Sequence, residues 1–206
     1  PLFSIIIIMC SIIGYSGNET AAPIIVKGLK RMEYRGYDSV GVATESENQI
    51  ELKKGIGKVT DVNSKFQLDT LPGRIGIGHT RWATHGKVTD LNAHPHPSNS
   101  GKIAIVHNGI IENFEELKKQ LEDDGYSFKS ETDSEIIANL LQKNYESTKN
   151  VKDTIMKTVS AIKGHYAFVA MFENGQLAAA RFHEPLIIGV GQENIFLSSD
   201  VLGFIE

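Results

Sequence analysis

Met9-Cys10-Ser11-Ile12-Ile13-Gly14-Tyr15 places a cysteine at the start of an apolar, β-branched run that predicts a strand over 12–15. Cys10 is the only cysteine in the 206 residues, so it forms no internal disulfide, and one thiol is too few for a thiolate metal cage. The thiol is therefore a small buried apolar side chain, which is common for free cysteine, or a nucleophile. Segments further along the chain favour the nucleophile.

The composition is that of an ordinary globular protein, with 41% apolar and 22% charged residues. The net charge is −4 and the two signs are interspersed, so we expect no nucleic-acid partner and no membrane partner. A single cysteine favours a reducing compartment, and we expect a cytoplasmic protein. The length suits one sizeable domain or two small ones, and no repeat or linker divides it.

The first nine residues, Pro1–Met9, contain four consecutive isoleucines but are too short to span a bilayer and lack a basic start. We expect residues 1–9 to be an extension: an added strand, a removable pro-segment, or residues ahead of a true start at Met9. Residues 10–206 would then form the functional domain.

The chain alternates between strand and helix patterns in an order typical of α+β folds with antiparallel sheets. Apolar β-branched runs predict strands over 12–15, 39–44, 49–53, 74–80, 102–107, 165–172, 176–181, 186–190 and 194–198. Stripes of apolar residues predict helices over 20–32, 134–145 and 151–162, and the signal at Asn113 described below predicts another over 113–123. Asn174-Gly175 predicts a hairpin turn between two of the later strands.

The helix ends also carry sequence signals. Asn113 with Glu116 resembles a capping box, and Thr132 or Asp133 can cap the helix that follows. Gly36 fits a residue just beyond a helix end, and Arg35 fits the last turn of that helix. Two tyrosines and an aspartate crowd the same segment, 31–39, and a helix end does not explain them.

His79-Thr80-Arg81-Trp82-Ala83-Thr84-His85-Gly86 leaves a strand and enters a loop. It holds the only tryptophan, a threonine hydroxyl, and an arginine that can bind a carboxylate through two hydrogen bonds. A mere surface loop rarely needs all three, so we favour a functional role for this segment.

Five histidines raise the hypothesis of a metal-dependent hydrolase: His79, His85, His94, His96 and His107. Their spacing argues against it, because no helical His-x-x-x-His motif is present and one pair flanks a proline. We expect no metal site, and interpret these residues as hydrogen-bonded loop histidines.

Asn108-Gly109 follows a strand and has two interpretations. The pair can be a simple turn, or it can present a side-chain amide and a backbone N–H in the same direction, as an oxyanion hole requires. Ser130–Glu135 likewise reads as plain helix capping, or as a segment whose Asp133 carboxylate accepts a ligand's ammonium group.

Taken in order, these segments resemble the class II glutamine amidotransferase domains, which are N-terminal-nucleophile hydrolases. The matching strings cover nearly the whole chain: 10–15, 34–39, 79–86, 92–96, 107–113 and 130–133. The strings Tyr34–Ser39 and His79–Gly86 point to the branch formed by the glutaminase domains of the isomerizing glutamine–fructose-6-phosphate aminotransferases, the glucosamine-6-phosphate synthases.

The resemblance implies an α+β fold, a four-layer α/β/β/α sandwich of two mainly antiparallel sheets. It implies that L-glutamine is hydrolysed to glutamate and ammonia through a thioester on Cys10, whose own free α-amino group acts as general base. No cofactor is implied. The ammonia would supply amino-sugar synthesis at a sugar isomerase domain with a fructose-6-phosphate acceptor, which we expect to be absent from this chain, and a homodimer is possible.

The resemblance also assigns the site residues. The Asn108 side chain and the Gly109 N–H would form the oxyanion hole. Arg81 would bind the α-carboxylate of glutamine and Asp133 its α-ammonium group. The remaining roles fall to Arg35 beside the nucleophile, Trp82 as a gate for ammonia, and Thr84 and His85 in the glutamine pocket.

Two departures from the family pattern matter. Nine residues precede Cys10, so we expect no activity until the bond between Met9 and Cys10 is cleaved. Ser11 stands where the family has glycine, and its side chain is expected to crowd the backbone beside the nucleophile. The alternatives are a catalytically inactive glutamine-binding or regulatory domain, and the glutaminase domain of another amidotransferase.

Overall fold

The computed structural model describes residues 10–82 and 87–205. One sheet has the strand order β3 (Gln49–Ile56), β2 (Ser39–Ser46), β4 (Ile75–Arg81), β1 (Ser11–Ser16), β10 (Ile195–Ser198) and β9 (Ile187–Val190). The other has the order β5 (His96–Pro97), β6 (Ile103–Ile111), β7 (Gly164–Phe172) and β8 (Leu177–Phe182). All pairings between these strands are antiparallel.

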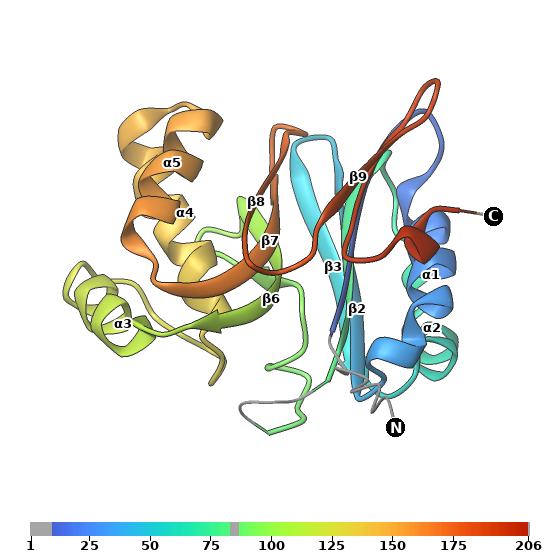
Figure 1. Cartoon of the computed structure of the whole chain (residues 1–206), viewed down its shortest axis with the longest axis horizontal. Helices are drawn as coiled ribbons and strands as arrows, with labels where there is room; N and C mark the ends of the chain where they lie inside the picture. Colours follow the sequence, from blue (N-terminus) through green and yellow to red (C-terminus); the bar gives the residue numbers. More distant parts are fainter. Residues whose placement is uncertain (1–9, 83–86, 206) are drawn as a thin grey trace, which may run out of the picture.

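Helices cover the outer face of each sheet (Figure 1). The six-stranded sheet is covered by α1 (Ala21–Arg31) and α2 (Val59–Phe66), and the four-stranded sheet by α3 (Phe114–Asp123), α4 (Ser134–Thr148) and α5 (Val151–Ala161). Short 3₁₀ turns occupy Glu33–Arg35, Leu68–Thr70 and Val201–Gly203. The expected four-layer α/β/β/α sandwich is confirmed.

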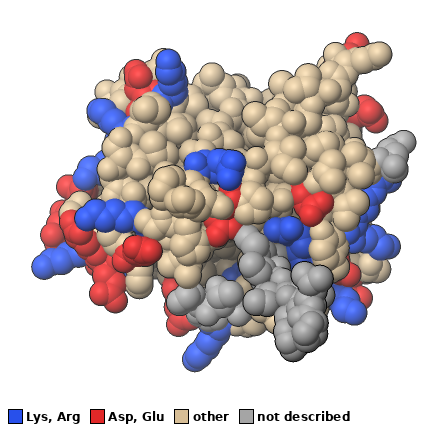
Figure 2. Space-filling view, viewed as in Figure 1, with Lys and Arg blue, Asp and Glu red and all other residues tan. Residues whose placement is uncertain are grey.

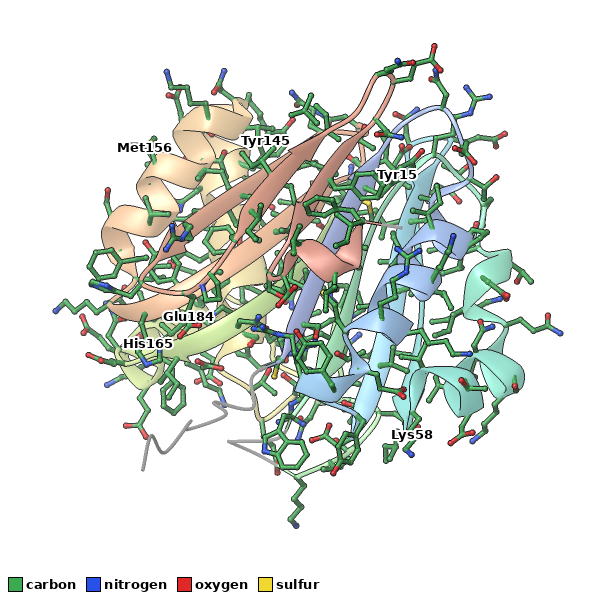
Figure 3. The ribbon with its side chains drawn as sticks, turned by 45° about the vertical axis from the view of Figure 1, so that its right-hand side comes forward. Tyr15, Lys58, Tyr145, Met156, His165 and Glu184 are labelled. Atoms are coloured by element: carbon green, nitrogen blue, oxygen red, sulfur yellow. The ribbon has the colours of Figure 1, made fainter. Side chains whose placement is uncertain are left out.

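The apolar core forms three layers. Between the sheets lie mostly small or β-branched side chains, among them Ala43, Ala104, Ala167 and Val169, which let the two sheets approach closely. A second layer joins α1 to its sheet, and a third joins α4 and α5 to theirs. Tyr145, labelled in Figure 3, packs against this third layer, and its ring lies 5.2 Å from that of Phe172.

The register of β1 fixes the position of Cys10. β1 lies between β4 and β10, with Ser11 opposite Thr80 and Ile13 opposite Ser198. Because the pairing with β4 is antiparallel, Cys10 at the start of β1 lies beside the end of β4, at Arg81. Residues far apart in the sequence therefore meet where β1 begins and β4 ends.

Asn113 and Asp133 occupy the N-cap positions of α3 and α4 as predicted, but neither side chain makes a capping hydrogen bond, because both bind elsewhere in the fold. Asn113 accepts a hydrogen bond from the Lys163 N–H (2.8 Å) and donates one to the Ala161 carbonyl (3.0 Å), which ties the start of α3 to the end of α5. The Thr132 hydroxyl contacts His96 Nε2 at 3.1 Å instead of capping α4.

Two turn predictions had different outcomes. The hairpin turn at Asn174-Gly175 is confirmed, with φ of +78° at Gly175 and a hydrogen bond from its N–H to the Phe172 carbonyl. Gly36 is not a left-handed residue beyond a helix end: α1 stops at Arg31, a 3₁₀ turn follows, and Gly36 is extended with φ of −172°.

Figure 2 shows acidic and basic side chains interspersed over the face in view, with carboxylates gathered around α3. None of the helices in the described part of the chain is long and apolar enough to cross a membrane.

Candidate active site around Cys10

The Cys10 thiol lies against the backbone of Trp82. The Trp82 N–H donates to Sγ at 3.1 Å, and Sγ lies 3.5 Å from the Trp82 carbonyl oxygen. Burial raises the pKa of the thiol, although the Trp82 N–H and the Arg81 charge oppose this. The thiol is therefore protonated at neutral pH and needs a base before it can attack. Among the residues described, no side-chain base is hydrogen-bonded to Sγ.

Asn108 brings a side-chain amide to the same residue. Its Nδ2 donates to the carbonyl oxygen of Cys10 at 2.9 Å, and its Oδ1 accepts from His79 Nε2 at 3.0 Å. Burial lowers the pKa of His79 to about 3, so the ring is neutral. Nε2 also lies 3.1 Å from the His107 carbonyl, and two acceptors assign the ring proton to Nε2. His79 thereby holds the amide nitrogen of Asn108 towards Cys10.

Gly109 lies inside β6, opposite Tyr166, so the interpretation of Asn108-Gly109 as a simple turn after a strand is wrong. Its φ is +116°, in the region that favours glycine. A Cβ at this position would overlap the carbonyl oxygen of His165 and lie 2.8 Å from the Tyr166 Cα. Only glycine fits here without displacing the backbone of β7.

Arg81 and the segment that carries Asp133 are linked by hydrogen bonds. Arg81 is 5% exposed, and its Nη1 donates to the Lys87 carbonyl at 3.3 Å. Asn92 Nδ2 donates to the same carbonyl at 2.9 Å and to Glu131 Oε2 at 3.2 Å. Arg81 and the acidic segment are thus linked through the Lys87 carbonyl and the Asn92 side chain.

Asp133 is anchored to the end of β6 rather than capping α4. Its Oδ2 accepts from the Ile111 N–H at 2.7 Å, and the Ser134 hydroxyl lies 3.4 Å from its Oδ1. The Ser134 hydroxyl also contacts His107 Nδ1 at 2.8 Å. The carboxylate therefore lies beside Ile111, which is two residues beyond Gly109 on β6. The expected pocket residues Thr84 and His85 lie outside the described residues.

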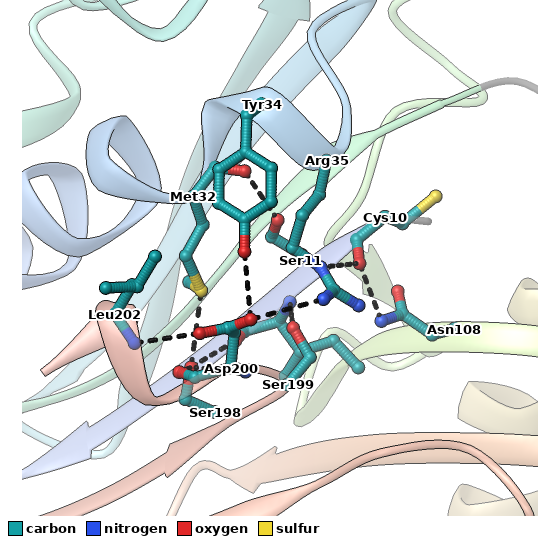
Figure 4. A network of polar contacts seen from close by, with 11 residues as sticks. Cys10, Ser11, Met32, Tyr34, Arg35, Asn108, Ser198, Ser199, Asp200 and Leu202 are labelled. Atoms are coloured by element: carbon teal, nitrogen blue, oxygen red, sulfur yellow. Dashed lines mark hydrogen bonds and ion pairs between the residues drawn. The ribbon is translucent and has the colours of Figure 1, made fainter. Parts of the chain in front are cut away.

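Arg35 reaches Cys10 from the 3₁₀ turn after α1. Its Nε donates to the Cys10 carbonyl oxygen at 3.4 Å, so this carbonyl has two side-chain donors, Arg35 and Asn108 (Figure 4). The other side of the guanidinium faces Asp200, with Nη1 at 3.5 Å from Oδ2. Sequence reasoning missed Asp200, because no local pattern marks a residue whose partner is 165 positions away.

Ser11 does not crowd the backbone, contrary to the expectation. Its side chain is fully buried and its hydroxyl donates to the Met32 carbonyl at 3.1 Å. This contact joins β1 to the end of α1 directly beside the nucleophile.

Replacing Ser11 with alanine is expected to lower the free energy of unfolding by about 1 kcal/mol, because the Met32 carbonyl loses one of its two donors and keeps only the Arg35 N–H at 3.0 Å. Urea denaturation measures the change. Ser64→Ala is the matched control, since the Ser64 hydroxyl makes a similar bond to a carbonyl at an exposed position and should contribute little. Equal effects of the two substitutions would contradict the stabilising role of Ser11.

Four of the five histidines form a buried cluster, three of them on strands rather than in loops: His79, His94, His96 and His107. The rings of His79 and His94 stack at 4.1 Å, and His94 Nδ1 accepts from the His107 N–H at 3.2 Å. Burial lowers the pKa of all four, so they are neutral in the folded chain. Within the described ranges, no group of three or more His, Cys, Asp or Glu side chains is placed to hold a metal ion.

The histidine cluster makes the fold sensitive to acid. These side chains bind protons near pH 6.5 when unfolded but only at lower pH when folded, so the unfolded chain takes up more protons and stability falls as pH drops below about 6.5. Four protons correspond to at most about 5 kcal/mol per pH unit.

Urea denaturation between pH 7 and pH 5 checks this expectation. His183→Gln is the control, because His183 is exposed and lies outside the buried cluster. A free energy of unfolding that stays constant from pH 7 to pH 5 would contradict neutral burial of the cluster.

Comparisons with known proteins agree with this geometry. A family model described as a glutamine amidotransferase domain matches residues 79–205. The glutamine–fructose-6-phosphate aminotransferase [isomerizing] of Pyrococcus horikoshii is 50% identical over 199 residues, which are 96% of this chain and 33% of that protein. The enzyme of the same name from Clostridium acetobutylicum is 46% identical over 195 residues, 94% and 32% of the two chains.

Solved structures extend the comparison. The glutamine phosphoribosylpyrophosphate amidotransferase of B. subtilis superposes with a TM-score of 0.82 at 31% identity, over 95% of this chain and 43% of that one. This chain spans about a third of the length of the aminotransferases that it matches. The matched residues include the end of β4, Asn108, Gly109 and Asp133. The chain is a member of the glutamine amidotransferase domain family.

Proposed function

We propose that the domain hydrolyses L-glutamine to glutamate and ammonia with Cys10 as the nucleophile. One observation carries the proposal: Asn108 Nδ2, from the four-stranded sheet, donates a hydrogen bond at 2.9 Å to the carbonyl oxygen of Cys10, which precedes β1 of the six-stranded sheet. A nucleophile beside a fixed hydrogen-bond donor is what acyl transfer requires.

The proposed reaction has four steps. The α-amine of Cys10 accepts the thiol proton, and Sγ attacks the side-chain amide carbon of glutamine. Asn108 Nδ2 and the Gly109 N–H stabilise the oxyanion that forms. The tetrahedral intermediate collapses, the protonated amine gives its proton to the leaving nitrogen, and ammonia departs. Water then hydrolyses the thioester, which releases glutamate and restores Cys10.

The α-amine is the proposed base because burial keeps the thiol protonated and an α-amine titrates near neutral pH. This requires that residues 1–9 be removed, so that residues 10–206 act as the domain. Trp82 would gate the departing ammonia, and Thr84 and His85 would line the glutamine pocket.

Glutamate release tests the proposal. We compare protein with Cys10 at its N-terminus, protein that retains residues 1–9, and a Cys10→Ser variant of the first. Hydrolysis by the first protein alone is the expected result. Equal hydrolysis with residues 1–9 retained would exclude the α-amine as base. Glutamine binding without turnover in all three would indicate an inactive binding domain.

Arg81→Ala is expected to raise the KM for glutamine by 100-fold or more, since a charge-assisted pair with the α-carboxylate contributes about 3 kcal/mol. Steady-state kinetics measures it. The kcat should change less than KM, because this contact is made equally in the ground and transition states. An unchanged KM would show that another group binds the carboxylate.

The ammonia is proposed to serve amino-sugar synthesis from fructose 6-phosphate in a longer protein with a sugar isomerase domain. The names of the matched relatives and the strings Tyr34–Ser39 and His79–Gly86 support this branch. Formation of glucosamine 6-phosphate from glutamine by the longer protein would test it. A homodimer stays a prediction, which sedimentation analysis would check.

A further inference from the structure

Asp200 lies two residues after the end of β10 and accepts hydrogen bonds on both carboxylate oxygens (Figure 4). The Tyr34 hydroxyl donates to Oδ2 at 2.9 Å, and Arg35 Nη1 lies 3.5 Å from the same oxygen. The Leu202 N–H donates to Oδ1 at 3.0 Å. The side chain of Asp200 is 24% exposed, so the ion pair with Arg35 is partly shielded from water.

The segment before Asp200 is fixed to the strand that carries the nucleophile. The Ser199 hydroxyl accepts from the Ile12 N–H at 3.0 Å, and the Ser199 N–H donates to the Ile12 carbonyl at 3.1 Å. The Ser198 hydroxyl donates to the same carbonyl at 3.1 Å. Asp200 is therefore held at a constant position relative to a residue only two places after Cys10.

Arg35 spans the distance between Asp200 and Cys10. Its side chain is 13% exposed, and a long side chain of this kind keeps one orientation only when its hydrogen bonds fix it. Nη2 is buried and has no hydrogen-bond partner among the described residues. The guanidinium is held by Asp200 at one side and by the Cys10 carbonyl at the other, and it also interacts with the Tyr34 hydroxyl.

We propose that Asp200 is a positioning residue for the nucleophile, which orients Arg35 so that Arg35 and Asn108 together fix the Cys10 carbonyl. The plane of this carbonyl defines the torsion ψ of Cys10, so fixing it fixes the direction of the α-amine relative to β1, while the Trp82 N–H holds Sγ at 3.1 Å. The proposal rests on the proposed glutaminase function, because the fixed geometry matters for proton transfer and attack.

The competing explanation is purely structural. Asp200 caps the 3₁₀ turn Val201–Gly203 through Oδ1, and this alone could hold the segment in place. The two explanations differ in what happens at a correctly folded active site. Loss of a cap reduces the amount of folded protein, whereas loss of positioning slows each folded site.

The test variant is Asp200→Asn, which keeps a side-chain oxygen for the Leu202 N–H and removes the charge that attracts Arg35. Asp124→Asn is the matched control, because it makes the same substitution in an exposed ion pair with Lys143, outside the site. Each protein is prepared with Cys10 at its N-terminus. Active sites are titrated with 6-diazo-5-oxo-norleucine, a glutamine mimic that alkylates the nucleophile, and kcat is expressed per titrated site.

The expected result is a kcat about 10-fold lower in Asp200→Asn per titrated site, with KM within about twofold, since a displaced nucleophile slows chemistry more than binding. Asp124→Asn should have the same kcat per titrated site and the same KM as the protein without substitutions. Combining Asp200→Asn with Arg35→Gln should lower kcat no further than Arg35→Gln alone, because both act through one contact.

Two results would overturn the proposal. A normal kcat per titrated site in Asp200→Asn, whether or not the melting temperature falls, would leave Asp200 as a cap only. Additive effects of the two substitutions would show that Asp200 does not act through Arg35. If the protein without substitutions, prepared with Cys10 at its N-terminus, neither reacts with the mimic nor hydrolyses glutamine, the proposed function fails, and this inference fails with it.

Discussion

Replacing Asn108 with aspartate is expected to lower kcat for glutamine hydrolysis by about 100- to 1,000-fold, the loss typical of one missing oxyanion donor. Aspartate has nearly the same size, so the site keeps its shape. The donor at Nδ2 becomes an acceptor that faces the Cys10 carbonyl, and a negative charge enters the place where the oxyanion forms. KM should change little, because the donor acts mainly in the transition state.

Steady-state kinetics measures both constants, and Asn174→Asp is the control. Asn174 lies exposed in the hairpin turn between β7 and β8, so the same chemical change there should leave kcat unaltered. A KM increase with an unchanged kcat in Asn108→Asp would contradict the oxyanion role and indicate that Asn108 binds the substrate.

Gly109→Ala is expected to destabilise the domain by about 3–5 kcal/mol. Two effects add: the left-handed backbone costs roughly 1–2 kcal/mol for alanine, and a Cβ that overlaps the His165 carbonyl forces β6 and β7 apart. Urea denaturation measures the loss, and the folded fraction should also be inactive, because the shift moves the Gly109 N–H away from the site.

Gly125→Ala separates the two effects. Gly125 also has a positive φ, +91°, but no atom lies within 4 Å of the place where its Cβ would be. Its substitution should therefore cost only the backbone term, about 1–2 kcal/mol. If both variants lost the same stability, the close approach between Gly109 and β7 would not be what requires glycine.

The regular elements could be predicted from the sequence because their patterns are local. The nine longer strands have β-branched apolar runs, and α1, α4 and α5 have apolar stripes at helical spacing. α2 was missed because Val59, Val62 and Phe66 are its only apolar residues over two turns. The two-residue strand β5 is too short to leave a pattern.

The residues of the candidate site also differ in whether the sequence alone reveals them. Cys10 and Arg81 stand at the ends of β1 and β4, and Asn108 lies within β6 beside Gly109; such chemistry-bearing side chains are noticeable in the sequence. The role of His79 as a partner of Asn108, and that of Asp200 as a partner of Arg35, depend on contacts between distant segments. The N-cap positions of Asn113 and Asp133 were predicted correctly, but their side chains make tertiary contacts in place of the local capping bonds.

The intact mass of the protein after exposure to 6-diazo-5-oxo-norleucine tests the central claim most directly, because Cys10 is the only thiol in the chain. The account predicts a species that begins at Cys10 and carries one adduct, while a Cys10→Ser variant carries none. A species that begins at Cys10 and stays unmodified would contradict the claim that this residue is the nucleophile of a glutaminase.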